Sequence, residues 1–177
     1  AEFDPAHSAR LQAVFTALEQ IKMAGEKALV FCEDLAMQAR LAAEIRHRFD
    51  ISHPVARIHG GVGPQMRQQI VNAFQTRPAG FDVLILSPKA GGVGLTLTAA
   101  NHVIHASRWW NPAVEDQATD RVYRIGQTRD VTVHLPLAVH PDPSLRDASF
   151  DFKLDQLMER KRGLSAQLLM PGETNGD

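Results

Sequence analysis

Apolar residues along this chain follow two patterns that alternate from one end to the other. Short continuous runs, such as 28–32 and 83–86, are typical of strands buried on both faces of a sheet. Between these runs, apolar residues recur every three or four positions, as at Leu11, Val14 and Phe15, which predicts amphipathic helices. The pattern predicts strands over 28–32, 55–58, 83–87, 102–106 and 131–135, and helices over 11–25, 35–49, 64–74, 112–124 and 150–169.

The alternation of strands and helices predicts an α/β fold, a parallel sheet with helices on both faces. In such sheets ligands bind beyond the carboxyl ends of the strands. Three polar or glycine-rich segments, 59–61, 87–94 and 107–111, each follow a predicted strand, so the candidate site is expected at that edge. The acidic pair 33–34 and Pro112 are predicted to start helices, as caps and as a first helical residue.

The composition is that of one globular domain. The chain has 177 residues, 44% of them hydrophobic, which is enough to bury a core, and its apolar runs are too short for a membrane span or a signal peptide. Its single cysteine, Cys32, is predicted to fill the core, and a reducing cytoplasm is expected. The eight histidines show no ligand spacing, so no metal site is expected. With a net charge of −1, nucleic-acid binding would need a local basic surface.

A loop able to bind an anion is predicted directly after the strand that ends near residue 87. Ser87 and Lys89 are followed by Gly91, Gly92 and Gly94. Glycines let backbone N–H groups approach a phosphate closely, because no side chain intervenes and positive φ is not penalised. The alternative is an ordinary tight turn.

The helix predicted from Pro112 carries the second candidate feature. Gln117, Arg121 and Arg124 are spaced i, i+4 and i+7, so we expect them on one helix face, with two guanidinium forks available to an anion. The alternative is that both arginines form weak surface pairs with acidic residues of the same helix. These acidic residues are Glu115, Asp116 and Asp120.

Together these segments resemble a known family. The stretch SPKAGGVGLTLTAA (87–100) is similar to motif V, and QATDRVYRIGQ (117–127) to motif VI, of the SWI/SNF-type ATPases, helicase-related translocases of superfamily two. The resemblance covers residues 8–135 and implies the second RecA-like lobe of the motor, with a three-layer fold. We expect that lobe to extend over 8–170 with a C-terminal helix that braces it, after a tag remnant or disordered lead (1–7) and before a flexible tail (171–177).

Two earlier segments also resemble family motifs but depart from them. Residues 27–33 are similar to motif IV, and 57–61 to the family's R-x-D-G-S-T, in which His59 here replaces the acid and glycine and valine replace the hydroxyl pair. Any phosphate contact at 61–62 is therefore expected to come from backbone N–H groups. In motif V, Lys89 stands where the family has arginine, which keeps the charge but not the fork.

The resemblance implies half of an ATP site. The sequence contains no G-x-x-x-x-G-K-[ST] and no Asp-Glu pair after an apolar strand, so ATP and Mg²⁺ are expected to be held mainly by an N-terminal RecA-like lobe. By resemblance, Arg124 and Arg121 are the catalytic arginines, which stabilise charge on the γ-phosphoryl group. The ATP-binding residues that the resemblance implies are Gly92, Gly94, Gln117, Arg121 and Arg124.

The implied partner is double-stranded DNA, bound without reading its sequence through phosphate contacts. Trp110 belongs to the family's W-N-P and is expected to pack in the minor groove or, alternatively, to anchor the core or a hinge. The DNA-binding residues that the resemblance implies are His59, Gly60, Ser87, Lys89, Gly91, Trp110 and Asn111.

Two other classes remain open at this point. A Rossmann-type enzyme is disfavoured because no G-x-G-x-x-G follows the first strand. A non-catalytic RecA-like module that binds nucleic acid or protein is the main alternative. The motifs do not say which process the motor serves, whether it unwinds strands, or whether further subunits join it.

Overall fold

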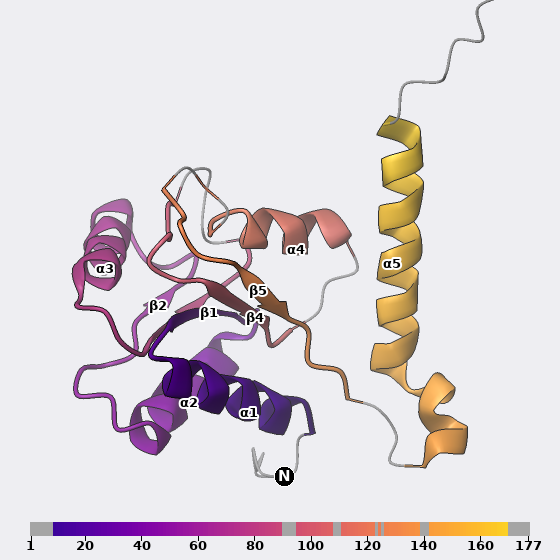
Figure 1. Cartoon of the computed structure of the whole chain (residues 1–177), viewed down its shortest axis with the longest axis horizontal. Coiled ribbons are helices and arrows are strands. Elements are labelled where there is room, and N and C mark those ends of the chain that lie inside the picture. The colour runs from indigo at the N-terminus through magenta and orange to yellow at the C-terminus, as the bar shows by residue number, and fades with distance from the viewer. Residues whose placement is uncertain are drawn as a thin grey trace, which may run out of the picture.

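The computed structural model describes residues 9–89, 95–107, 111–122, 124, 126–138 and 142–169. The predicted alternation of strands and helices is confirmed (Figure 1). The helices are α1 (Ala9–Ala24), α2 (Leu35–Arg48), α3 (Pro64–Thr76), α4 (Pro112–Thr119) and α5 (Phe150–Leu169), with a 3₁₀ helix, η2 (Pro143–Ala148). The strands are β1 (Lys27–Phe31), β2 (Arg57–Ile58), β3 (Asp82–Leu86), β4 (His102–His105) and β5 (Thr132–His134).

The five strands form one sheet in the order β2-β3-β1-β4-β5, and every pairing is parallel. The most apolar strands, β1 and β3, lie inside the sheet, which explains their continuous apolar runs. The chain crosses from β1 to the β2 edge and then returns past β1 to β4. This topology is that of the RecA-like lobe expected from the motifs.

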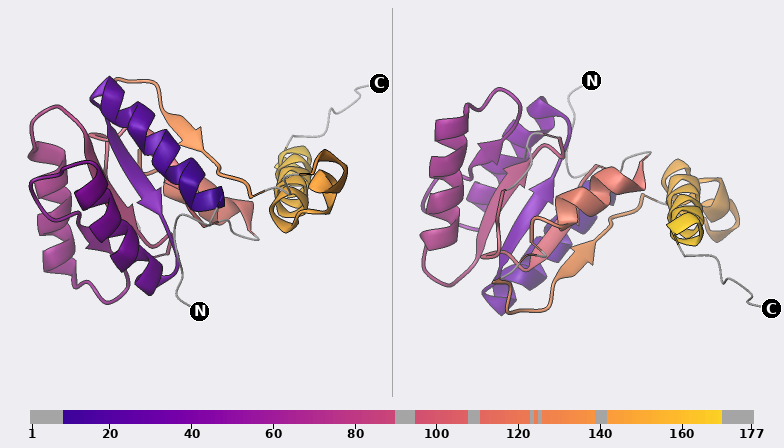
Figure 2. Two further views of the ribbon diagram at one scale, coloured as in Figure 1. Left: turned by 90° about the horizontal axis from the view of Figure 1, so that it is seen from below. Right: turned by 90° about the horizontal axis from the view of Figure 1, so that it is seen from above.

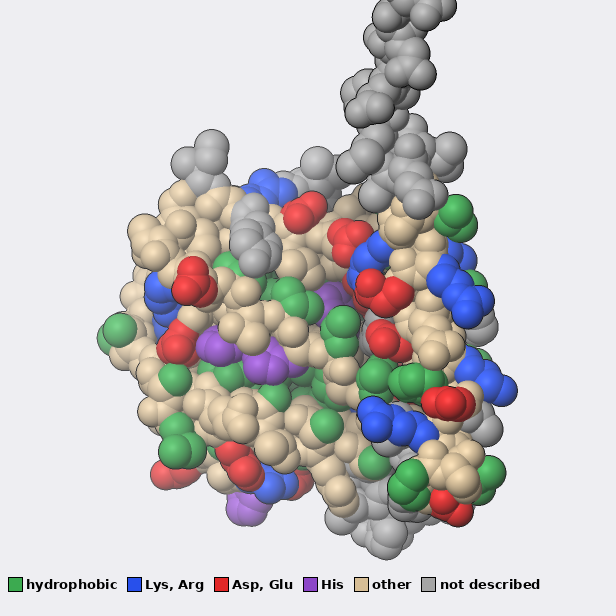
Figure 3. All heavy atoms as spheres, turned by 45° about the vertical axis from the view of Figure 1, so that its right-hand side comes forward, with side chains coloured by type: hydrophobic (Ala, Val, Ile, Leu, Met, Phe, Trp, Pro, Cys, Tyr) green, Lys and Arg blue, Asp and Glu red, His purple; other side chains and the backbone are tan. Residues whose placement is uncertain are grey.

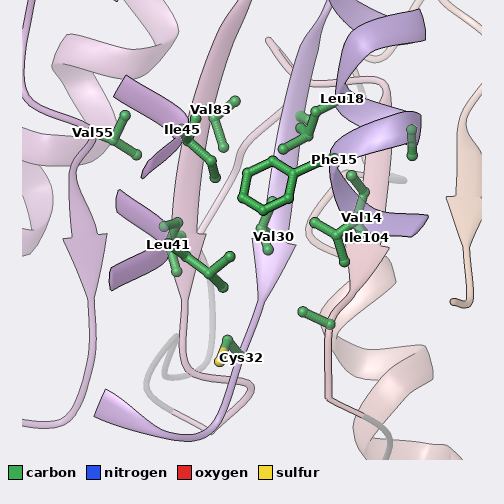
Figure 4. Packing of buried hydrophobic residues seen from close by; sticks show 14 of the residues in the cluster. Val14, Phe15, Leu18, Val30, Cys32, Leu41, Ile45, Val55, Val83 and Ile104 are labelled. Atoms are coloured by element: carbon green, nitrogen blue, oxygen red, sulfur yellow. The ribbon is translucent and has the colours of Figure 1, made fainter. Parts of the chain in front are cut away.

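Side chains of β1 and of Cys32, which follows it, alternate between two cores, one on each face of the sheet. Ala28, Val30 and Cys32 pack with α1 and α2, whereas Leu29 and Phe31 pack with α3 and α4. Figure 4 shows Phe15 of α1 over Val30 in the first core, with Leu41 and Ile45 of α2 on the other side. Seen from below, α1 and α2 lie in front of the sheet, and seen from above α4 does (Figure 2). The three-layer prediction is therefore correct.

Capping residues define where the helices begin. Asp34, and not Glu33, is the N-cap of α2, because its carboxylate accepts a 2.6 Å hydrogen bond from the backbone N–H of Met37. In α4 the side chain of Asn111 plays this part, accepting from Ala113 N–H at 3.0 Å. These caps show that α2 begins after Asp34 and α4 after Asn111.

The prediction that α4 extends to residue 124 is wrong, since the helix ends at Thr119. The apolar period continues beyond this point, because Ala118 and Val122 both face the second core. However, the carbonyl of Arg121 accepts a hydrogen bond from Leu97 N–H at 3.1 Å. The N–H groups of Arg121 and Val122 also bond carbonyls only three residues back, those of Ala118 and Thr119, so the helix ends in a tighter turn.

Helix α5 contacts the domain at two places, as expected of a bracing helix. Near its start, buried Asp151 accepts hydrogen bonds from the guanidinium of Arg10 and from Ala138 N–H. Further along, Arg162 pairs with Glu115 and Asp116 of α4 at 3.1 Å. Figure 3 shows basic and acidic side chains next to each other where α5 comes forward. Among the helices of the described part of the chain, none is long and apolar enough to cross a membrane.

Candidate functional site

The carboxyl ends of the parallel strands meet at one edge, and the predicted site residues follow them. Backbone bonds align these ends: Ser87 N–H donates to Ile58 O at 2.8 Å, and Cys32 N–H donates to Leu86 O at 3.0 Å. His59 and Ser87 therefore stand side by side after β2 and β3. The placement expected from the alternating pattern is correct for these residues.

The hydroxyl of Ser87 is held by a helix that the sequence did not connect with it. Ser87 is half-buried, and its Oγ accepts a hydrogen bond of 2.8 Å from the amide of Gln38 in α2. Gln38 is fully buried. Lys89, two residues beyond Ser87, is exposed.

The loop after β2 differs from the expectation that backbone N–H groups at 61–62 would face a phosphate. The N–H of Gly61 donates to His59 Nδ1 at 3.2 Å, and the N–H of Val62 donates to His59 O at 2.9 Å. Both donors are used inside the loop. Because Nδ1 accepts this bond, a neutral His59 carries its proton on Nε2. The Nε2–H group of the imidazole can then donate to a molecule bound at this loop.

Gly60 stands beside this imidazole on the surface. A Cβ added there would meet no atom within 4 Å, and its φ does not require glycine. Neither space within the described chain nor backbone strain demands a glycine at this position. Close approach by a molecule from outside would explain it.

Three arginines gather next to these loops. Arg121 lies in the turn after α4 and is only 7% exposed, and burial lowers the pKa of its guanidinium. The neighbouring positive charges of Arg124 and Arg67 lower that pKa further. Arg124 is exposed. The arginine cluster (Arg67, Arg121 and Arg124) is therefore a concentration of positive charge that favours a bound anion.

The prediction that Gln117, Arg121 and Arg124 share one helix face is wrong, because both arginines lie beyond the end of α4. Gln117 remains on the helix and is exposed. The structure brings in Arg67 of α3 instead, which the sequence alone did not single out. Its Nη2 donates to Val62 O at 3.1 Å, and its buried Nε has no hydrogen-bond partner in the described part of the chain.

Two glutamine side chains form hydrogen bonds with residues 98–100, which follow the glycine-rich loop. Gln127 Nε2 donates to Ala100 O at 2.7 Å and to Thr98 O at 3.2 Å. Gln75 of α3 donates to Thr98 Oγ1 at 3.1 Å and accepts from Ala99 N–H at 2.8 Å. These bonds join the end of one predicted motif to the other. The sequence did not predict these bonds, because the residues that they join lie far apart along the chain.

The acidic residues of α4 have a different partner from the one considered. Glu115 is buried and, with Asp116, forms ion pairs with Arg162 of α5. These pairs anchor α5.

Cys32, possible metal ligands and the predicted site residues not yet placed are considered together. Burial raises the pKa of the Cys32 thiol, so it is an unreactive core residue, as predicted. The described residues contain no group of three or more side chains that could hold a metal ion. Four predicted site residues, Gly91, Gly92, Gly94 and Trp110, lie outside the described residues.

Comparison with known proteins adds three findings. The family model described as the helicase conserved C-terminal domain matches residues 10–126. The putative ATP-dependent helicase/translocase YwqA of Bacillus subtilis is 39% identical over 162 residues, which cover 92% of this chain and 16% of that protein. The Zorya protein ZorD of Escherichia coli is 41% identical over 149 residues, 81% of this chain and 13% of that protein. The chain thus spans less than a fifth of the length of these relatives.

Solved structures resemble the whole fold. The Sulfolobus solfataricus SWI2/SNF2 ATPase core in complex with dsDNA is 34% identical, with a TM-score of 0.70, over 96% of this chain and 33% of that chain. The C-terminal part of the Fun30 ATPase domain is 28% identical, with a TM-score of 0.71, over 86% of this chain and 46% of that chain.

Proposed function

This chain belongs to the helicase conserved C-terminal domain family and is a SWI/SNF-type C-terminal lobe, and on that basis we propose that it serves as the second motor lobe of an ATP-dependent double-stranded DNA translocase. The observation that carries the proposal is the arginine cluster. Arg67 joins it to the loop after β2, and the carbonyl of Arg121 bonds Leu97, in the segment that leads into β4. Nucleotide contacts would therefore lie beside the loop after β2 that we assign to DNA.

The residues present suit the phosphates of ATP. A guanidinium stays ionised even when burial lowers its pKa, and its planar fork matches phosphate oxygens. Arg121 is buried and held by its backbone, whereas Arg124 is exposed and free to face a second lobe. We assign Arg124 to the transferring phosphoryl group and Arg121 to orientation beside it, with Gln117, Gly92 and Gly94 nearby.

The complete reaction needs groups that this chain's motifs do not include. Bound ATP would supply the phosphoryl group that is transferred to water, and Mg²⁺ would neutralise charge on the phosphate oxygens. Without a P-loop lysine or an acidic pair for Mg²⁺, this lobe by itself is expected to hydrolyse no ATP. Its own residues would bind and orient phosphate oxygens and exclude water when the two lobes close.

The DNA side consists of donors suited to phosphate oxygens. These are the Nε2–H of His59, the hydroxyl of Ser87 and the ammonium of Lys89, with Gly60 leaving room for the backbone of the duplex. Gly91 and Trp110 are proposed neighbours. Asn111 keeps only its amide NH₂ for DNA, because its oxygen caps α4. Such contacts fix position without reading sequence.

Duplex binding at several salt concentrations tests the DNA assignment. We expect weak, sequence-independent binding by the intact protein whose logarithm falls linearly with the logarithm of the salt concentration. Lys89→Ala should weaken binding to all sequences alike and flatten the slope by about one, since one phosphate contact is lost. Lys153→Ala on α5 removes the same charge from an exposed helix and should leave the slope unchanged. A changed sequence preference with an unchanged slope for Lys89→Ala would contradict the assignment.

A further inference from the structure

Gln38 is an amide buried in the face of α2 that otherwise carries Leu41 and Ile45. It is 0% exposed, and its Oε1 has no hydrogen-bond partner within the described residues. Leaving a buried acceptor unsatisfied costs about 1–3 kcal/mol. A leucine or methionine would fill the position without that cost, so packing alone does not explain the amide.

The hydrogen bonds of Gln38 fix which way its amide is turned. Nε2 lies 2.8 Å from the carbonyl oxygen of Cys32 and 2.8 Å from Ser87 Oγ. A carbonyl oxygen can only accept, so the NH₂ group and not the oxygen must face Cys32. The same NH₂ group therefore also donates to Ser87.

This arrangement determines how Ser87 can bind another molecule. Because Oγ accepts from Gln38, the hydroxyl hydrogen of Ser87 is turned away from the amide and remains a donor. The backbone N–H of Ser87 is already donated to Ile58 O. The hydroxyl is thus the donor that Ser87 offers, and donation from Gln38 polarises it and strengthens its next hydrogen bond.

We propose that Gln38 is a positioning residue for DNA: it holds the Ser87 hydroxyl in the orientation that donates to a phosphate oxygen of the duplex. It also joins the ends of β1 and β3, because one amide group bonds Cys32 and Ser87 together. The inference rests on the proposed function, since it requires Ser87 to lie against DNA.

A double-mutant cycle on duplex affinity of the intact protein tests this role. Gln38→Met keeps the volume and removes the donor, and Ser87→Ala removes the hydroxyl. Each should weaken binding about 3- to 10-fold, the effect of one hydrogen bond. In the Ser87→Ala background, Gln38→Met should add nothing, because Gln38 acts through that hydroxyl. The exposed Gln20→Met on α1 should leave the affinity unchanged.

Each other outcome has a distinct meaning. If Gln38→Met weakens binding equally with and without the Ser87 hydroxyl and lowers the melting temperature, Gln38 is a structural residue and the inference is overturned. If Ser87→Ala has no effect while Lys89→Ala weakens binding, this edge still binds DNA, but the positioning role of Gln38 is contradicted. If neither Ser87→Ala nor Lys89→Ala weakens binding, the proposed function fails at this face.

Discussion

Single residues at this edge owe their chemistry to what surrounds them. Arg121 and Arg124 come from one motif, yet Arg121 is buried with its carbonyl bonded to Leu97, and Arg124 reaches solvent. His59 gains a defined tautomer because the N–H of Gly61 occupies its Nδ1. Residue type alone indicates the charge, whereas burial and hydrogen bonding decide which atom can meet a ligand.

A histidine pair away from the site makes stability depend on pH. His102 Nδ1 and His134 Nε2 lie 3.1 Å apart, with Glu26 and Arg129 as charged neighbours. Burial lowers the pKa of both imidazoles; Glu26 opposes this at His102, Arg129 adds to it, and His102 adds to it at His134. Between the folded pKa values and about 6.5, the unfolded chain binds more protons, so stability falls as pH decreases.

Thermal unfolding between about pH 7.5 and 5.5 checks this expectation. The melting temperature should fall on acidification, and His134→Gln should reduce the fall, because it removes one buried imidazole. The exposed His47→Gln on α2 serves as the control and should not change the fall. An equal fall in the parent and His134→Gln chains would contradict the account.

Among the elements, α3 depends on a lysine from a neighbouring strand. Lys27 of β1 is only 5% exposed, and its Nζ donates to Phe74 O at 3.1 Å and Arg77 O at 2.9 Å. These carbonyls belong to the last turn of α3 and to its C-cap residue, where a cation also stabilises the helix dipole. A buried lysine here is thus a cap rather than a catalytic group.

Lys27→Met should therefore lower the free energy of unfolding by about 2–4 kcal/mol, since two charge-assisted hydrogen bonds of about 1.5–3 kcal/mol each are lost while the cost of burying the ammonium is recovered. Lys22→Met is the matched control: exposed Lys22 binds one carbonyl, that of Phe49, and should lose less than about 1 kcal/mol. Denaturant titration of both variants measures the difference. Equal losses would mean that burial of Lys27 adds nothing to its capping role.

The elements were predictable where the pattern is local. Apolar runs predicted β1 and β3, and the spacing of apolar residues predicted α1, α2 and α3. The end of α4 was not predictable, because the apolar period continues to Val122 although the backbone bonds beyond Asp120 reach back only three residues. Likewise, Gln38 and Ser87 are 49 positions apart, so no local pattern links them. Polar contacts between distant elements are what sequence periodicity cannot show.

At the scale of the whole molecule, parallel strands bring together residues from motifs far apart in sequence. The loop after β2 and Ser87 after β3 meet at one edge because these strands pair in parallel, and Arg67 connects the arginine cluster to the loop after β2. Helix α5 is tied to this lobe by Arg162, so the acidic face of α4 is already occupied. Under the proposed function, the arginine cluster would face a nucleotide shared with a second lobe.

The most direct test of this account is ATP turnover and ATP affinity of the intact protein carrying Arg124→Ala. If Arg124 stabilises charge on the transferring phosphoryl group, turnover should fall by about 10³–10⁵ with ATP affinity changed far less. Arg124→Lys should not restore turnover, because lysine lacks the bidentate fork, and the melting temperature should hardly change for an exposed side chain. Near-normal turnover in Arg124→Ala, with a lowered melting temperature, would contradict the assignment.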